Sequence, residues 1–191
     1  MRFTDYLNEN EYKVQPKTKK ELEQIISNTI REKGYDCDLN FIDTNLISDM
    51  SDLFNDMPFN GDISKWNVSN VKDMNAMFCD SNFNGDISKW NVSNVEDMHD
   101  MFLGSNFNGD ISNWNVSNVK NMDTMFSGSN FNGDISKWNV SNVEDMRSMF
   151  MDSKFNKDIS KWNVSNVKDM DSMFDECPLE NKPRYQPKFK D

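Results

Sequence analysis

The feature that most constrains this sequence is a 24-residue repeat that runs through most of the chain. Five tryptophans mark it, and the residues around each of them recur in the same order: Trp66, Trp90, Trp114, Trp138 and Trp162. A fixed period of about 20 to 50 residues is typical of repeat architectures, in which one supersecondary unit stacks on its copies. The period therefore indicates a stacked wall of coils, whose default role is a binding or structural surface.

The chain divides into five parts around this repeat. In order they are a polar segment (1–17), a helix (18–34), a degenerate first coil (35–58), five full repeats (59–178) and a basic tail (179–191). Thr18 and Glu21 form a capping box, and Gly34 suits the position after the last helical turn. The apolar residues of the helix fall on one face, which predicts a cap over the first coil.

The apolar pattern changes within each repeat. Around Ile63, Trp66 and Val68 it alternates as in a strand, which predicts a parallel sheet built from successive coils. From Asn70 the apolar spacing becomes three and four, which predicts a short helical segment with Asn70 as its N-cap. We therefore predict an α/β repeat solenoid of right-handed, leucine-rich-repeat-like coils, with the sheet on one face and the helical segments on the other.

Charge and composition exclude several classes of partner. The net charge is −11 and the sequence pI is about 4.5, so the chain repels nucleic-acid phosphates and anionic lipid. No stretch is apolar enough for membrane insertion, and the N-terminus lacks the apolar core of a signal peptide. Three cysteines without metal-ligand spacing are expected to be free thiols, as in a reducing compartment.

Equivalent residues of stacked coils form rows, and several rows allow two interpretations. The tryptophan row is interpreted as a buried core rung, with an aromatic platform for sugars or bases as the alternative. The methionine rows are interpreted as core filler rather than a metal site. In the row that contains Asp62, each carboxylate is expected to accept backbone hydrogen bonds in its own turn, with bridging by calcium as the alternative.

Other rows are polar. Lys72, Glu96, Lys120, Glu144 and Lys168 alternate in sign, which predicts ion pairs between neighbouring coils. The asparagines equivalent to Asn67 are expected to form an amide ladder on the sheet. We predict that the concave sheet face binds the partner, through Lys65, Asn67, Lys89, Asn91, Asn113, Asn115, Lys137, Asn139, Lys161 and Asn163.

Catalysis has little support in the sequence. His99 is the only histidine, and no nucleophile or orienting acid is tied to it by a motif. The chain has no glycine-rich phosphate loop and no Cys/His pairing. We therefore predict no catalytic residue, no metal and no cofactor.

The run D-I-S-x-W-N-V-S-N-V-x-D-M-x-x-M-F, from Asp62 onward, resembles the BspA-type leucine-rich repeat of bacterial surface proteins, which also occurs in mycoplasma lipoproteins of unassigned function. The resemblance covers residues 35–178. It implies a curved solenoid on the cell surface that adheres to a host or matrix protein. The missing export signal instead favours a cytoplasmic location, and so an intracellular scaffold or effector without a surface role. In both cases the predicted function is non-enzymatic protein binding.

Overall fold

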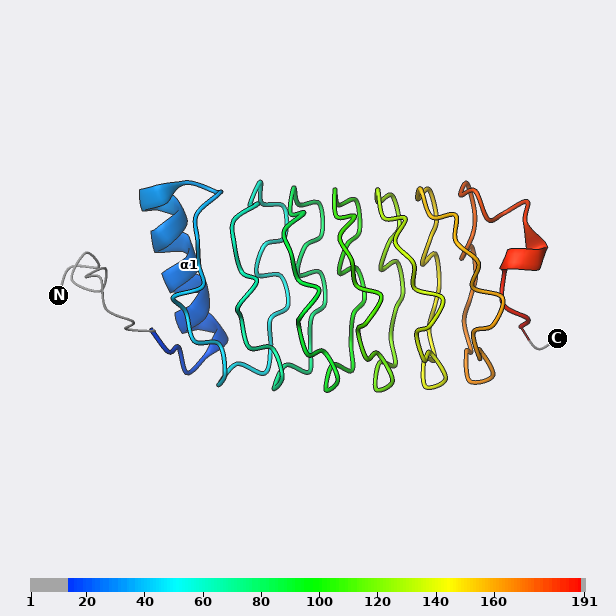
Figure 1. Cartoon of the computed structure of the whole chain (residues 1–191), viewed down its shortest axis with the longest axis horizontal. Helices are drawn as coiled ribbons and strands as arrows, with labels where there is room; N and C mark the ends of the chain where they lie inside the picture. Colours follow the sequence, from blue (N-terminus) through cyan, green and yellow to red (C-terminus); the bar gives the residue numbers. More distant parts are fainter. Residues whose placement is uncertain (1–13, 190–191) are drawn as a thin grey trace.

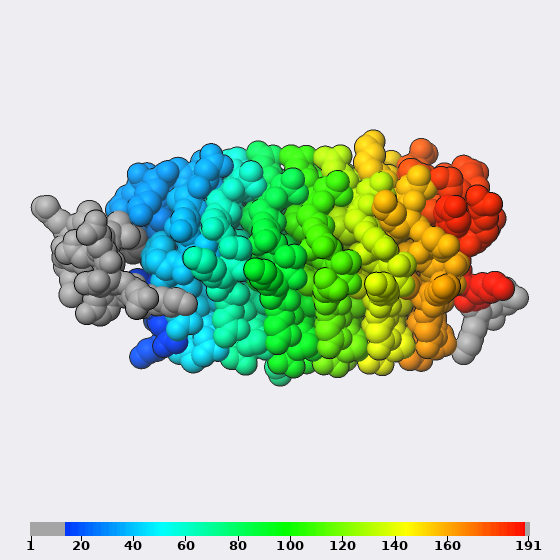
Figure 2. Space-filling view, in the orientation of Figure 1, coloured from blue at the N-terminus to red at the C-terminus, as the bar shows by residue number. Residues whose placement is uncertain are grey.

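In a computed structural model the chain winds into coils that stack one on the next (Figure 1). The structure describes residues 14–189, so most of the polar segment predicted for 1–17 and the last two residues of the basic tail lie outside the described part. One end of the stack is covered by helix α1, Lys19–Lys33, and the other carries the short 3-10 helix η2, Pro183–Tyr185. The space-filling view shows successive coils side by side in sequence order (Figure 2).

The predicted fold class, an α/β solenoid with a parallel sheet and short helices, is wrong. Within residues 14–189 the structure contains α1 and η2 but no strand, so no sheet is present. Strand-like pairing is limited to isolated parallel bridges. Six of the bridged residues form one row through the stack: Asp49, Asp73, Asp97, Asn121, Asp145 and Asp169.

The sheet is missing because local turns use the backbone groups that a ladder would need. The Trp66 N–H donates to the carbonyl of Ile63 at 3.1 Å, and the Val71 N–H to that of Val68 at 3.0 Å. Each of these bonds joins residues three apart and closes a tight turn, whereas a strand keeps its backbone extended. The same two turns recur in every full repeat, so the stretch predicted as strand is a series of corners.

The predicted helical segment after Asn70 is also absent. Ala76 has a φ of +50°, and the equivalent residue of every coil is likewise left-handed, which interrupts a right-handed helix. Asn70 is not an N-cap: its side-chain Nδ2 donates to the carbonyl of Asn45 at 2.7 Å, in the preceding coil. Apolar spacing of three and four arises here from tight turns rather than from helical turns.

Hydrogen bonds between coils run along the stretch that follows each Val-Lys or Val-Glu pair. The N–H groups of Met74, Ala76 and Phe78 donate to carbonyls of the next coil at 2.9–3.0 Å. The N–H groups between them bond back within their own coil, as when Met77 donates to the Met74 carbonyl at 3.3 Å. Every second N–H group of this stretch therefore points towards the C-terminal end of the stack.

The core is a set of aromatic and methionine rows that run the length of the stack. Successive tryptophans such as Trp66 and Trp90 stack with ring centroids 6.5 Å apart and rings 3° from parallel. Phe78 and Phe102 stack in the same way at 5.6 Å. The tryptophans are 4–5% exposed, which confirms the core interpretation against the aromatic platform. Methionines such as Met98 are fully buried, so they are core filler as predicted.

Helix α1 closes the N-terminal end of the core. The Thr18 side chain accepts a hydrogen bond from the Glu21 N–H at 3.2 Å, and the Gly34 N–H donates to the Ile30 carbonyl at 2.7 Å with φ +85°. Leu22 and Ile26 are buried in the common core. Covering the end of a repeat stack in this way keeps its apolar face from water.

Neither helix within residues 14–189 has the length and apolar character needed to cross a bilayer.

Candidate functional site

The five full repeats differ from one another mainly in one stretch of each coil. Most slots keep the same residue in all five copies, including those of Phe59, Ile63, Trp66 and Asn70. The slot after the first methionine instead reads Asn75, His99, Asp123, Arg147 and Asp171. The next slot reads Ala76, Asp100, Thr124, Ser148 and Ser172. Identical slots build the stack, so only the varied slots can give one coil a different chemistry from another.

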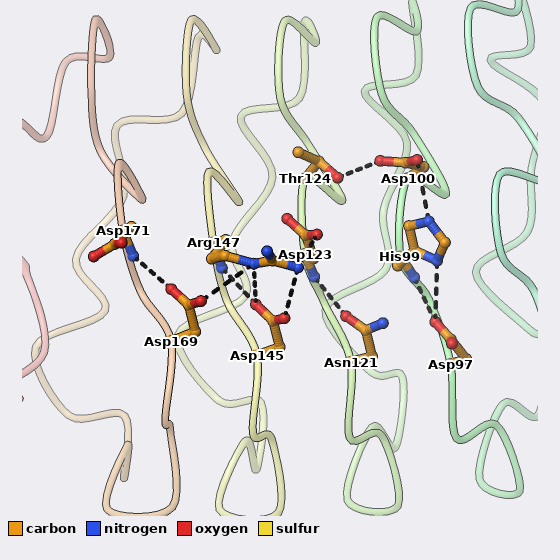
Figure 3. Close-up of polar contacts among 10 residues, drawn as sticks. All are labelled: Asp97, His99, Asp100, Asn121, Asp123, Thr124, Asp145, Arg147, Asp169 and Asp171. Atoms are coloured by element: carbon orange, nitrogen blue, oxygen red, sulfur yellow. Dashed lines mark hydrogen bonds and ion pairs between the residues drawn. The ribbon is translucent and has the colours of Figure 1, made fainter.

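The varied residues that Figure 3 labels lie next to one another on one side of the stack. We call the residues labelled in that figure the variable face. It comprises six residues of the varied slots, His99, Asp100, Asp123, Thr124, Arg147 and Asp171, and four of the adjoining bridge row, Asp97, Asn121, Asp145 and Asp169. Asp123 and Thr124 are half-buried and Arg147 is exposed. The face follows the row of isolated bridges, which sets neighbouring coils in register.

The bridge row holds the backbone from which the varied side chains project. The Oδ1 atoms of Asp97 and Asp145 accept the N–H groups of His99 and Arg147 at 2.9 and 3.0 Å. Asn121 accepts the Asp123 N–H in the same way at 3.0 Å. An acceptor two residues before the donor closes an Asx turn, which fixes the direction of the following side chain.

Arg147 is the centre of the polar network on this face. Its Nη2 lies 2.8 Å from Asp123 Oδ2 in the preceding coil and 3.0 Å from Asp145 Oδ2 in its own coil. Its Nε lies 3.5 Å from Asp169 Oδ2 in the following coil. One guanidinium therefore holds carboxylates from three coils. Burial raises the pKa of Asp123, and this effect exceeds the lowering by Arg147.

His99 forms a smaller group beside this network. Its Nε2 lies 3.2 Å from Asp100 Oδ2, and its Nδ1 lies 3.7 Å from Asp97 Oδ1. Asp100 also accepts a hydrogen bond from the Thr124 hydroxyl. The variable face carries six carboxylates against one guanidinium and one imidazole, so it is acidic.

The arrangement does not assemble a nucleophilic triad. The Thr124 hydroxyl bonds to Asp100 and not to His99, whereas activation requires the imidazole next to the nucleophile. Burial raises the pKa of the Cys79 thiol to about 12, which keeps it protonated and unreactive. Within residues 14–189 no group of three or more His, Cys, Asp or Glu side chains could hold a metal ion.

The binding residues predicted from the sequence lie elsewhere on the coils. One slot is exposed in all five repeats, and it holds Lys65, Lys89, Asn113, Lys137 and Lys161. No ion pair within the described residues includes these lysines. The part of the chain that the structure describes has no sheet to carry them, and so no concave sheet face. Their part in binding stays a prediction.

The asparagine row beside these lysines is also exposed: Asn67, Asn91, Asn115, Asn139 and Asn163. The predicted amide ladder along it is wrong. Each Oδ1 accepts the N–H of the serine two residues on, as in Asn115 with Ser117 at 3.2 Å. Side-chain amides do bond from coil to coil in another row, where Asn130 Nδ2 donates to Asn106 Oδ1 at 2.9 Å.

Two other predicted rows are present. Each aspartate of the Asp62 row accepts the N–H of the serine two residues on, at 2.9 Å for Asp110 and Ser112, which confirms the turn interpretation. Ion pairs join Lys120 to Glu96 at 2.7 Å and Lys168 to Glu144. Each lysine pairs only with the glutamate of the preceding coil, so the predicted ladder is a set of separate pairs.

Sequence reasoning missed the variable face because it followed the residues that repeat. The signal was available: with the copies superposed at a period of 24, the slot of Asn75 holds Asn, His, Asp, Arg and Asp, and so changes in both size and sign of charge.

A family model with the description "Mycoplasma protein of unknown function, DUF285" matches residues 20–129 and 105–186. The chain belongs to this family. The matched ranges together contain all the full repeats and the whole variable face. No curated protein and no solved structure matches the chain.

Proposed function

We propose that the chain is a non-enzymatic protein-binding repeat module and that the variable face is its recognition surface. The observation that carries the proposal is the separation of uniform from varied residues. Uniform rows supply the core and the turns, while the slots of Asn75 and Ala76 vary along one side of the stack, where Arg147 and His99 are available to solvent.

The chemistry of this surface favours a basic protein segment as the partner. Six carboxylates are spread over four coils, and Arg147 compensates those nearest to it. Lysine or arginine side chains of a partner would complement carboxylates that Arg147 does not contact, such as those of Asp100 and Asp171. Complementary charge of this kind contributes mainly to specificity and to the rate of association.

The resemblance to BspA-type repeats supports a more specific proposal, adhesion to a host or matrix protein at a bacterial cell surface. One observation favours a second candidate, an intracellular scaffold or effector without a surface role. Cys37, Cys79 and Cys177 are all unpaired, as is usual for proteins of a reducing compartment. The two candidates share the variable face and differ in where the partner is found.

The experiment compares three forms of the full chain as immobilised bait. The test variant is Asp100→Asn/Asp123→Asn/Asp171→Asn, which removes varied charges and leaves the Asx turns of the bridge row intact. The control is Glu23→Gln/Glu32→Gln/Asp36→Asn, which changes the net charge equally at exposed residues on or just after α1. Captured proteins are quantified by mass spectrometry from host extract and from extract of the source cells.

The proposal predicts a protein that wild type and control capture and that the test variant loses. Its presence in host extract supports adhesion, and its presence in the source-cell extract supports the scaffold. Equal capture by all three forms would contradict the assignment of the variable face.

A further inference from the structure

The last coil of the stack carries backbone donors that no acceptor meets. At the preceding junction the N–H groups of Met146, Ser148, Phe150 and Asp152 donate to carbonyls of the next coil at 2.9–3.0 Å. The equivalent donors of the last coil have no hydrogen-bond acceptor within residues 14–189: Met170, Ser172, Phe174 and Glu176. We call these four residues the terminal edge.

The terminal edge also exposes apolar side chains that every other coil buries. Met170 is 39% exposed, whereas Met146 in the same row of the preceding coil is 0% exposed. Phe174 is half-buried, whereas Phe150 is fully buried. A hollow of about 350 Å³ lies beside them, lined in part by Phe189.

The segment after Cys177 covers only part of the last coil. The Tyr185 carbonyl accepts the Ile159 N–H at 2.9 Å, and Leu179 is fully buried, so this segment closes the side of the coil near Trp162. Within residues 178–189, no carbonyl of this segment accepts a hydrogen bond from the terminal edge. Figure 1 shows it lying against the end of the stack beyond the last coil.

We propose that the terminal edge binds an extended segment of a second protein, which adds to the stack as a further coil would. The internal junctions define what such a segment needs. It presents a carbonyl at every second residue, and it buries a methionine and an aromatic side chain over Met170 and Phe174. Pairing of an extended peptide with free backbone groups at an edge is a recurrent mode of recognition.

The charges at the junctions specify one further feature of the segment. Arg147 reaches Asp123, which occupies the same slot of the preceding coil, at 2.8 Å. The last coil has Asp171 in this slot, where it is exposed and has no ion pair within the described residues. A bound segment with arginine after its methionine would therefore reproduce the Arg147–Asp123 contact. The predicted pattern is Met-Arg-x-Met-Phe.

A second copy of this chain does not fit the edge. The complementary carbonyls lie on the first coil, whose end is covered by α1, with Lys19 Nζ 3.4 Å from Asp49 Oδ1 and Leu22 buried. Two terminal edges facing each other would oppose donors to donors, which leaves both sets without acceptors. The described ends of a second copy thus do not pair with the edge, and we take a segment from a different protein as the occupant.

The test titrates the isotope-labelled full chain with a peptide that copies residues 142–153. In the folded chain, the coil 107–130 already donates hydrogen bonds to this segment, which contains Arg147. We expect saturable binding with slowed amide exchange at Met170, Ser172, Phe174 and Glu176. The amides of Met146 and Phe150, which are already bonded, are the internal control and should not change.

The charge contact is tested by a swap. A peptide with aspartate in place of Arg147 should bind about tenfold more weakly, as for a desolvated contact worth about 1.4 kcal/mol. The Asp171→Arg protein should show the reverse preference between the two peptides. The Phe174→Asp protein, checked for an unchanged melting temperature, should bind neither peptide.

Two outcomes would overturn the proposal. One is the absence of protection at the four amides with the peptide in millimolar excess. The other is slowed exchange of these amides when the protein is concentrated without peptide, together with dimers in analytical sedimentation. That result would make a second copy of the chain the occupant. Binding without a swapped preference would overturn the assignment of Asp171.

Discussion

The indole Nε1 of Trp114 donates a hydrogen bond to the carbonyl oxygen of Ile87 in the preceding coil, at 3.1 Å. The same contact recurs at every tryptophan, so each ring both fills the core and ties its coil to the one before. The tryptophan slot is therefore constrained twice, by volume and by a donor at a fixed position. This explains why no other residue replaces it in the five full repeats.

Trp114→Ala should destabilise the chain by about 3–5 kcal/mol, because it empties a buried site between two stacked coils. Trp114→Phe keeps a ring but leaves the Ile87 carbonyl without this donor, and should cost about 1–3 kcal/mol. Urea unfolding followed by circular dichroism measures both. Equal stability of the three proteins would show that the row is not a core element.

Arg147→Met should lower the melting temperature, because the carboxylates of Asp123, Asp145 and Asp169 then face one another without a cation. Added salt should reduce the difference from wild type, since it screens the repulsion between carboxylates. Burial already raises the pKa of Asp123, so Asp123→Asn should restore part of the loss in the Arg147→Met background. Calorimetry of the four forms provides the double-mutant cycle. If both single variants lower the melting temperature additively, the network is not coupled.

The Asp62 row should make the fold sensitive to acid. Hydrogen bonds from the serine two residues on hold the pKa of Asp110 below its ordinary value, with the backbone bond contributing most. A lowered pKa in the folded state means stability that is present above the unfolded pKa of about 3.9 and is lost as the pH falls below it. The free energy of unfolding should therefore be level from neutral pH to about pH 5 and decline towards pH 3.

Asparagine can keep this turn without the titration, as Asn121 does in the bridge row at 3.0 Å. The variant with asparagine at residues 62, 86, 110, 134 and 158 should fold at pH 7 and decline less between pH 5 and pH 3. Unfolding by urea at each pH measures the slope for both proteins. If the free energy of unfolding declines equally with pH in both proteins, the acid sensitivity comes from other carboxylates.

Gly128 and Gly104 test the left-handed corner that follows each Met-Phe pair. Both have φ +62°, so an added Cβ is strained at either position, by about 1–2 kcal/mol. A Cβ on Gly128 would meet only ordinary contacts, whereas one on Gly104 would collide with the Asp80 carboxylate. Gly104→Ala should therefore destabilise more than Gly128→Ala in thermal melts. Adding Asp80→Ala should remove the excess, and a persistent excess would place the clash elsewhere.

The sequence predicts the parts of this fold that depend on side-chain volume and period. The Trp66 row and the Met74 row are invariant, large and regularly spaced, so their burial wherever a further coil follows can be predicted from the repeat alone. The Asp62 turns follow in the same way, because an aspartate two residues before a serine recurs with the period. Helix α1 is marked by Thr18, Glu21 and Gly34, whose capping roles are local.

The backbone path between these rows could not be predicted in the same way. Ala76 and Thr124 adopt left-handed φ values of +50° and +51°, although neither residue type signals that conformation. The stacked neighbours impose it, since each N–H there donates to the next coil. A strand was predicted because apolar residues that alternate usually belong to a strand. A helix was predicted because apolar residues spaced by three and four usually belong to a helix. The Arg147 network was missed because arginine occurs in this slot only once.

The claim that the variable face recognises a protein is tested most directly by photo-crosslinking. A benzophenone amino acid replaces His99, on the variable face, or Lys89, on the row of exposed lysines, and each protein is illuminated with the extract that yields a partner. We predict crosslinks to the partner from position 99 and none from position 89. Crosslinks from position 89 alone would contradict the account and return recognition to the lysine row.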